Sequence, residues 1–135
     1  MTEERRGAYR VSVKPSSGLS ASMSLENRRW KATPGNVSTD GVFLRLAPDA
    51  PVSLEVDTPV VVEMTFGDEA PLKLHGTIRT RRAGGYGIFF PSRTDDGYVN
   101  PLTRLGHVWA ELQRDDLSKR LFVGKDWQSL HDANK

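Results

Sequence analysis

Alternation of apolar and polar residues with a period of two is the feature that most constrains the fold of this chain. In the segment LKLHGTIRT, one set of alternate residues consists of Leu72, Leu74, Ile78 and Thr80. This pattern is typical of a strand with one buried face. It predicts that the charged residues of the other set, which include Arg79 and Arg81, point outward.

Several other segments have the character of short strands. GVFLRL alternates between apolar and other residues, while PVVVEMTF and GYGIFF are β-branched or aromatic runs bounded by glycine and proline. RVSV and SASMSL form an early strand or an interrupted pair, and RRWKATPGNVS contains another strand. About six or seven short strands separated by turn signals predict a mainly β fold, a small antiparallel barrel or sandwich.

The periodicity changes only after the segment GYVNP. Asn100 is suited to cap a helix, with Pro101 at the first helical position. One face of this helix would then carry Leu102, Leu105, Trp109 and Leu112. We expect this apolar face to close one end of the barrel, since the stripe is too short to favour a coiled coil.

Length and composition are those of a single domain with a tail. The 135 residues are enough for one core, and the chain has no cysteine for a disulfide or a cysteine-ligated metal. The amino terminus lacks the apolar stretch of a signal peptide, and no run is long enough to span a membrane. We therefore expect a cytoplasmic protein without membrane insertion.

Catalytic and metal-binding patterns are absent from the sequence. His75, His107 and His131 are scattered, with no two at the spacing of metal ligands. The sequence contains no nucleophile elbow, Walker loop or dinucleotide fingerprint, and the glycine-rich GGYG indicates a hairpin turn because it leads into a strand. We expect no catalytic residues, no metal and no enzymatic activity.

Two short stretches carry the functional signal. ERRGAYR places Arg5, Arg6 and Arg10 in an arm ahead of the first strand. In NVSTDG, Asn36 and Ser38 fall on the same face of a strand, and Asp40 with Gly41 is expected to supply a tight turn, with Gly41 free to take a positive φ. By itself, each stretch is also compatible with a solvated basic face or a simple hairpin.

Read together, the two stretches resemble the signature of the PilZ domain family. The R-x-x-x-R element spans Arg6 to Arg10, and the D/N-x-S-x-x-G element spans Asn36 to Gly41. The resemblance covers about residues 4–112. It implies a six-stranded antiparallel β-barrel closed by a C-terminal helix, and a receptor for the bacterial second messenger cyclic di-GMP. We accordingly assign residues 1–114 to the PilZ domain with its arginine arm, and residues 115–135 to a C-terminal tail that we expect to be helical.

The resemblance also assigns roles to residues. It implies that Arg6 and Arg10 contact guanine and phosphate, that Asn36 and Ser38 bond a guanine edge, and that Gly41 lets the backbone approach the ligand. Arg5, at a position associated in this family with stacking on an additional guanine, implies an intercalated ligand dimer. Some family members place a further stacking side chain on the outer face of the strand before the last, so Arg79 or Arg81 would either play this part or belong to an ordinary exposed cationic strand.

Arginine chemistry supports this ligand independently, because a guanidinium can grip a phosphate or the O6/N7 edge of guanine and can also stack on a base. A polar arm of ten residues has little apolar surface to hold it down, so we expect it to become ordered when ligand binds. Ordering would change the surface presented to an unidentified protein partner.

Two alternative functions use the same features. A single-stranded nucleic-acid-binding barrel would use the basic clusters together with Phe43, Tyr86, Phe89 or Phe90 as stacking platforms. The aromatic content of 8% disfavours it, and so does the alternation of neighbouring Phe89 and Phe90 on opposite faces of a strand. The other alternative is a nucleotide-independent PilZ module that acts through protein contacts alone, which the complete motifs disfavour.

Overall fold

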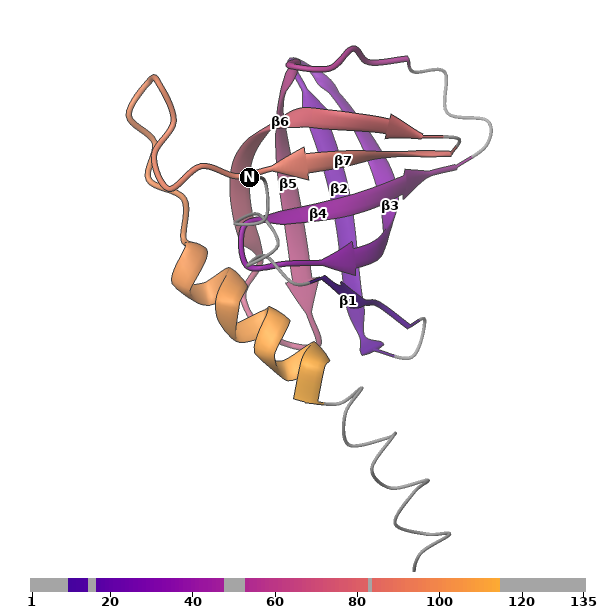
Figure 1. The fold of residues 1–135 in the computed structure, drawn as a ribbon, viewed down its shortest axis with the longest axis vertical. Helices are drawn as coiled ribbons and strands as arrows, with labels where there is room; N and C mark the ends of the chain where they lie inside the picture. Colours follow the sequence, from indigo (N-terminus) through magenta and orange to yellow (C-terminus); the bar gives the residue numbers. More distant parts are fainter. Residues whose placement is uncertain (1–9, 15–16, 48–52, 83, 115–135) are drawn as a thin grey trace, which may run out of the picture.

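A computed structural model of the chain describes residues 10–14, 17–47, 53–82 and 84–114 (Figure 1). The described residues form seven strands followed by one helix, which begins at residue 102 and continues to residue 114. The strands are β1 (Val11–Ser12), β2 (Leu19–Leu25), β3 (Arg28–Val37), β4 (Gly41–Leu46), β5 (Pro59–Phe66), β6 (Leu72–Arg82) and β7 (Gly85–Phe89). RVSV and SASMSL thus belong to two separate strands. The predicted helical tail, residues 115–135, lies outside the described residues.

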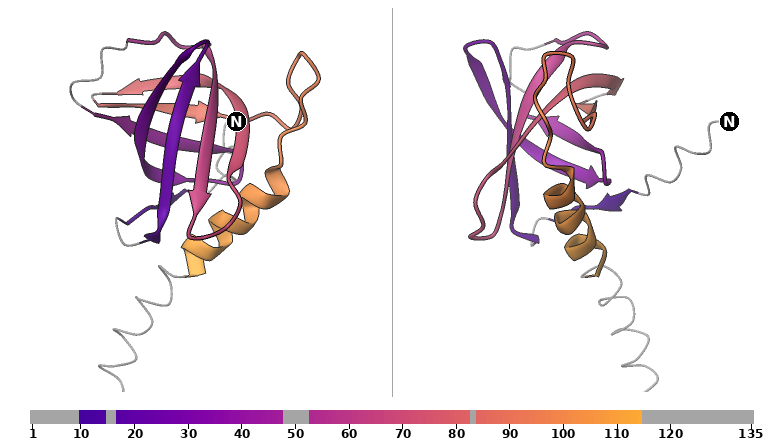
Figure 2. Two further views of the ribbon diagram at one scale, coloured as in Figure 1. Left: turned by 180° about the vertical axis from the view of Figure 1, so that it is seen from behind. Right: turned by 90° about the vertical axis from the view of Figure 1, so that its left-hand side faces the viewer.

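The strands close into an antiparallel barrel (Figures 1 and 2). Their order is β1-β3-β2-β5-β6-β7-β4, and pairing of β3 with β4 closes the sheet on itself. The six longer strands β2 to β7 make the barrel, while the two-residue β1 adds to β3 outside this ring. The predicted six-stranded antiparallel barrel with a C-terminal helix is therefore confirmed.

The predicted alternation of buried and exposed residues along β6 is observed as far as a β-bulge. Leu72, Leu74 and Ile78 are buried in the core, as predicted. The register with β7 shifts between Ile78 and Thr80, and Thr80 is exposed instead of buried. The extra residue of a bulge reverses the alternation that follows it. The prediction that Thr80 is buried with the apolar set is therefore wrong.

The helix packs against one end of the barrel through its apolar face (Figure 1). Leu105, Val108 and Leu112 belong to the same buried cluster as the strand residues, and Leu102 and Trp109 pack against it half-buried. A guanidinium hydrogen bond from Arg104 to the Ala70 carbonyl, 2.8 Å long, ties the helix to the β5–β6 turn. None of the described helices is long and apolar enough to cross a membrane.

Asn100 has a different role from the one predicted. The first helical hydrogen bond runs from the Leu105 amide to the Pro101 carbonyl, so the helix begins one residue later than expected. The buried Asn100 side chain instead bonds both backbone groups of His75: its Oδ1 accepts from the amide at 2.7 Å, and its Nδ2 donates to the carbonyl at 2.8 Å. Nδ2 also donates to the Pro91 carbonyl at 2.6 Å. Asn100 therefore anchors the segment between β7 and the helix to β6.

Residues 91–99 form the loop that projects from the barrel between β7 and the helix (Figure 1). Hydrogen bonds from Thr94 Oγ1 to Asp96 and from the Tyr98 amide to Thr94 Oγ1 brace it internally. Tyr98 fixes it to β6, because its ring stacks on His75 at 3.8 Å and its hydroxyl donates to the Lys73 carbonyl at 2.9 Å. The loop thus has a defined position relative to the barrel.

Candidate nucleotide-binding face

The register of β1 brings the arginine arm beside the second motif. Val11 pairs with Val37 and Ser12 pairs with Asn36 in an antiparallel arrangement. Arg10, which directly precedes Val11 and is exposed, therefore enters next to the Ser38 end of β3. Arg5 and Arg6 lie outside the described residues. Strand pairing thus joins the end of one motif to the start of the other, although they are about 25 residues apart in sequence.

The turn between β3 and β4 is built by the second motif itself. The Ser38 amide donates to the Gly41 carbonyl at 2.9 Å, so Thr39 and Asp40 are the two turn residues. The Ser38 side chain is 4% exposed, and its hydroxyl donates to Asp40 Oδ1 at 3.2 Å while accepting from the Asp40 amide at 3.3 Å. The hydroxyl that we expected to be presented beside Asn36 is therefore engaged within the turn. Asn36 is half-buried, and no hydrogen bond of its amide side chain is found within the described part of the chain.

Gly41 is required by close packing and not by its φ angle. Among the described residues, Gly18, Gly67, Gly84 and Gly97 are the glycines with positive φ, so Gly41 does not use its freedom to adopt a positive φ. Gly41 is instead the first residue of β4, where a Cβ atom would lie 2.7 Å from the Ile88 carbonyl oxygen of β7. Any side chain at this position would push the two strands apart.

The motif turn is also bonded directly to the end of β7. The Phe90 amide donates to the Asp40 carbonyl at 2.8 Å. Gly41 pairs with Phe89, and Phe89 in turn pairs with Thr77 of β6. The motif turn, β7 and β6 consequently form one continuous patch of the barrel surface.

Arginine side chains cover aromatic rings on this patch. The guanidinium carbon of Arg79 lies 4.3 Å from the centroid of the half-buried Phe89 ring. Arg45 and Arg82 lie over Phe43 at 5.4 and 5.6 Å. Phe43 is only 6% exposed, yet it is not part of the barrel core. These contacts have the distances of cation–π interactions and hold flat guanidinium groups on the outside of the barrel.

Glycines of the flanking strands make room for Phe43. A Cβ atom on Gly85 of β7 would lie 2.7 Å from its Cζ, and one on Gly35 of β3 would lie 3.2 Å from its Cδ2. The ring therefore lies flat against the sheet. Sequence reasoning interpreted GGYG only as a turn. The period-two spacing of Gly85 and Gly87 on β7 was the available signal for this packing.

We define the motif face by Asn36, Ser38, Gly41, Phe89 and Arg79, with Arg10 entering at its edge. Arg81 does not belong to it. Its guanidinium forms an ion pair with Glu55 at 3.2 Å and a hydrogen bond to Ser53 at 3.4 Å. The bulge at Ile78 and Thr80 separates the directions of Arg79 and Arg81, which simple alternation had placed on one face. The structure thus gathers Arg79, but not Arg81, with the second motif.

The basic residues of β3, which are Arg28, Arg29 and Lys31, lie outside the motif face. Arg29 forms a 2.9 Å ion pair with Glu63 of β5 and a 3.2 Å hydrogen bond to the Ser22 hydroxyl.

Among the described residues, no group of three or more histidine, aspartate or glutamate side chains is arranged to hold a metal ion.

The predicted aromatic platforms for single-stranded nucleic acid are mostly inaccessible. Phe43, Tyr86 and Phe90 are all buried, at 6%, 8% and 0% exposure. Phe89 is half-buried beneath Arg79. Base stacking along a strand requires several exposed rings in series, and these four residues do not provide such a series.

Fold and face together define a small antiparallel barrel that carries an arginine-containing surface. The sequence matches the PilZ domain family over residues 4–105, and the chain belongs to this family. PilZ domains are generally receptors without catalytic activity. No curated protein matches the sequence.

Solved structures agree with this assignment at the level of the fold. The PilZ domain of YcgR from Escherichia coli, solved with c-di-GMP, superposes with a TM-score of 0.67 at 14% identity, covering 86% of this chain and 97% of that one. YcgR in complex with c-di-GMP gives a TM-score of 0.65 at 17% identity, covering 88% and 50%. The inhibitor of motility MotI/DgrA of Bacillus subtilis gives 0.63 at 14% identity, covering 86% and 53%. The chain therefore spans about half the length of these two larger proteins.

Proposed function

We propose that this protein is a non-enzymatic receptor for cyclic di-GMP that binds the nucleotide on the motif face and signals to a protein partner. The observation that carries the proposal is the pairing of Val11 with Val37, which sets Arg10 beside the Asn36 to Gly41 motif. YcgR of Escherichia coli, whose PilZ domain has a similar fold, was solved with this nucleotide both as the PilZ domain and as the longer protein.

The chemistry of the motif face suits the ligand. Cyclic di-GMP carries two phosphates and two guanines, so its binder needs cations together with planar groups or hydrogen-bonding edges. Arg6 and Arg10 would supply the cations from the arm, and the Asn36 side chain would supply an amide for a guanine edge. Arg79, already held over Phe89, would offer a guanidinium plane on which a guanine can stack.

Ser38 and Gly41 would act mainly by shaping the turn. The Ser38 hydroxyl holds Asp40, and the missing side chain of Gly41 allows β4 to approach β7 closely. We infer that both residues position the backbone against which the ligand lies, instead of contributing large interactions of their own.

Binding would gather Arg5, Arg6 and Arg10 against the barrel. Each charge-assisted hydrogen bond contributes about 1.5–3 kcal/mol, offset by the entropy of ordering the arm, so the expected affinity is micromolar or somewhat tighter. Arg5 would stack on an additional guanine, which gives two intercalated ligand molecules per chain. The ordered arm would then present a new surface to the partner.

Calorimetric titration with cyclic di-GMP tests the proposal directly, because it gives affinity and stoichiometry together. Filter binding with a short single-stranded oligonucleotide at physiological salt is the matching test of the nucleic-acid alternative. Saturable nucleotide binding with a stoichiometry near two, and no oligonucleotide retention, is the expected result. Tight, length-dependent retention of the oligonucleotide without any effect of cyclic di-GMP would overturn the proposal.

A further inference from the structure

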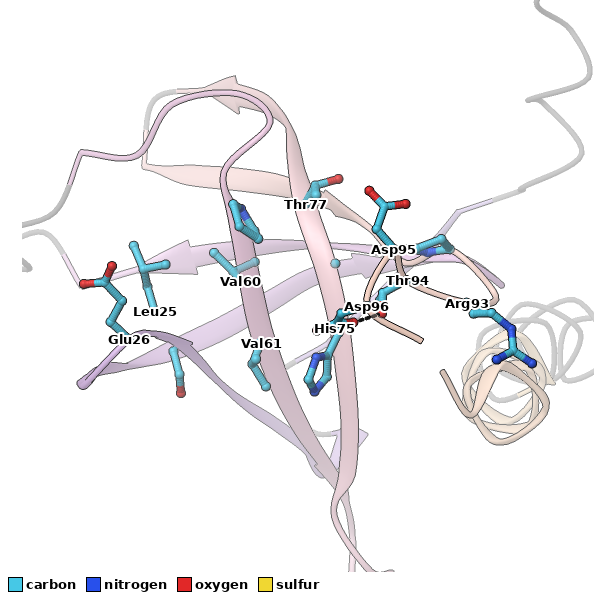
Figure 3. A pocket seen from close by; sticks show the side chains of 14 residues that line it. Leu25, Glu26, Val60, Val61, His75, Thr77, Arg93, Thr94, Asp95 and Asp96 are labelled. Carbon is cyan, nitrogen blue, oxygen red and sulfur yellow. Dashed lines mark hydrogen bonds between the residues drawn. The ribbon is translucent and has the colours of Figure 1, made fainter. Parts of the chain in front are cut away.

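Away from the motif face, a recess lies on the barrel between the 91–99 loop and the turn joining β2 to β3 (Figure 3). Its volume is about 470 Å³, within the range typical of ligand-binding pockets. We call it the loop groove and define it by Glu26, Val61, His75, Thr77, Asp95 and Asp96. It contains none of the residues that define the motif face.

The floor of the loop groove is formed by the sheet. Val61 of β5 pairs with Ser24 of β2 on one side and with His75 of β6 on the other, so these three side chains form a row across the sheet. Pro59 and Thr77 form the next row. Leu25 and Pro91 add further apolar surface to the lining. The middle of the groove is therefore largely apolar.

The two ends of the groove are acidic. Figure 3 shows Glu26 on one side and Asp95 and Asp96 on the opposite side, with Val60, Val61 and Thr77 between them. Within the described ranges, no ion pair joins any of these three carboxylates to a cation. Among the described residues of the lining, Arg93 is the one lysine or arginine. The groove thus carries an excess of negative charge on a chain whose formal net charge is +2.

The acidic wall of the groove, formed by Asp95 and Asp96 of the 91–99 loop, is held in place before anything binds. Asn100 fixes the base of the 91–99 loop to β6 through two side-chain hydrogen bonds to the His75 backbone, and a third bonds the Pro91 carbonyl. Tyr98 in addition stacks on His75. Hydrogen bonds from Thr94 and from the Tyr98 backbone lower the pKa of Asp96 below its ordinary value, so this carboxylate is ionised at neutral pH. A preformed wall reduces the ordering cost of association.

From this arrangement we infer that the loop groove binds an extended segment of a partner protein in which apolar residues are flanked on both sides by lysine or arginine. The apolar residues would cover Val61 and its neighbours, and the flanking cations would meet Glu26 at one end and Asp95 at the other. A small amine carries a single cation and would meet only one of the two acidic ends. A nucleotide or nucleic acid would be repelled by the same carboxylates.

The groove and the motif face share β6. Thr77 lines the groove and pairs with Phe89, the residue that Arg79 covers on the motif face. The role of the groove as the output surface of a cyclic di-GMP receptor rests on the proposed function. Binding of the peptide segment to the groove does not depend on that function, so this binding is tested on the full chain without nucleotide.

The experiment selects random heptapeptides displayed on phage against the immobilised full chain, then measures the best synthetic peptide by fluorescence anisotropy. We expect enrichment of apolar residues flanked by lysine or arginine. The double variant Glu26→Gln with Asp95→Asn should weaken the selected peptide at least about threefold. The matched control, Asp68→Asn with Glu69→Gln, removes the same charge from exposed residues after β5 and should leave the affinity unchanged.

Several outcomes would overturn the inference. These are failure to enrich any sequence, enrichment of acidic sequences, or equal weakening by the groove and control variants. Sedimentation of the wild-type chain provides another: a dimer that the groove variant dissociates would make the occupant a second copy of this chain. Calorimetry with cyclic di-GMP on the same proteins is a separate readout, so failure of nucleotide binding would overturn the proposed function without affecting the peptide result.

Discussion

The guanidinium of Arg79 lies 4.3 Å from the centre of the Phe89 ring, whereas that of Arg81, two residues further along β6, is paired with Glu55. If the motif face binds cyclic di-GMP, Arg79 and not Arg81 is the arginine of β6 that is placed to stack on a guanine. We predict that Arg79→Ala weakens cyclic di-GMP binding by about 1–2 kcal/mol, about five- to thirtyfold, as measured by titration calorimetry.

Arg81→Ala is the matched control for this prediction, because it removes an equally charged and exposed side chain from the same strand. Its affinity for the nucleotide should remain that of the wild type. Equal losses in the two variants would indicate a general effect of charge and would contradict a specific role for Arg79.

Gly41 should be essential to the fold as well as to binding. A Cβ atom at this position would lie 2.7 Å from the Ile88 carbonyl oxygen, and both atoms belong to paired strands that cannot separate without losing hydrogen bonds. We expect Gly41→Ala to lower the free energy of unfolding by about 1–3 kcal/mol, measured by urea denaturation. Gly106→Ala provides the contrast: nothing lies within 4 Å of the new methyl group, and alanine favours a helix, so stability should stay the same or rise by up to about 1 kcal/mol.

Asn100 should be among the most important polar residues for stability. Its truncation in Asn100→Ala would leave the backbone groups of His75 and the Pro91 carbonyl without their partner. We expect a loss of about 2–3 kcal/mol in the free energy of unfolding. Asn27→Ala, at an exposed turn residue, should change it by less than about 0.5 kcal/mol. Similar effects of the two substitutions would show that the anchoring hydrogen bonds contribute little.

His75 should make stability depend on pH. Burial lowers the pKa of its imidazole below the ordinary value of 6.5, and the charge of Lys73 lowers it further, while Asp96 opposes the shift. Below about pH 6.5 the unfolded chain therefore binds a proton that the folded chain does not, so stability falls as the pH falls until the folded pKa is passed.

The His75→Phe variant keeps a ring against Tyr98 and removes the titrating group. Thermal unfolding at pH 7.5 and at pH 5.5 should show a smaller drop in melting temperature for this variant than for the wild type. An identical drop in the two proteins would exclude His75 as the source of the pH dependence.

The strands and the helix could be predicted because their periodicities are local. Leu72, Leu74 and Ile78 alternate as a strand in an antiparallel barrel must, and Leu105 and Leu112 face the core from the helix. The bulge at Ile78 and Thr80 has no such local signal, because it depends on the register that β7 imposes. Alternation alone therefore misplaced Thr80 and could not separate Arg79 from Arg81.

For the candidate site, the sequence identified the motif residues but not the contacts that these residues make. The motif includes Ser38 and Gly41. In the structure, Ser38 bonds Asp40, and Gly41 lies against the Ile88 carbonyl of β7, a strand that is adjacent in the sheet but distant in the sequence. The role of Asn100 was missed for a similar reason. An asparagine before a proline indicates a helix cap, whereas two of the three hydrogen bonds of the Asn100 side chain go to His75, 25 residues earlier on β6.

The proposed function depends most on the arm, because the pairing of Val11 with Val37 sets Arg10 beside the second motif. Calorimetric titration of cyclic di-GMP into the wild type, Arg6→Ala and Arg10→Ala tests this directly, with Arg114→Ala as a charge-matched control on the helix. We expect micromolar or tighter binding by the wild type and the control, and no measurable binding by Arg6→Ala or Arg10→Ala at unchanged melting temperature. Wild-type affinity in both arm variants would contradict the proposed function.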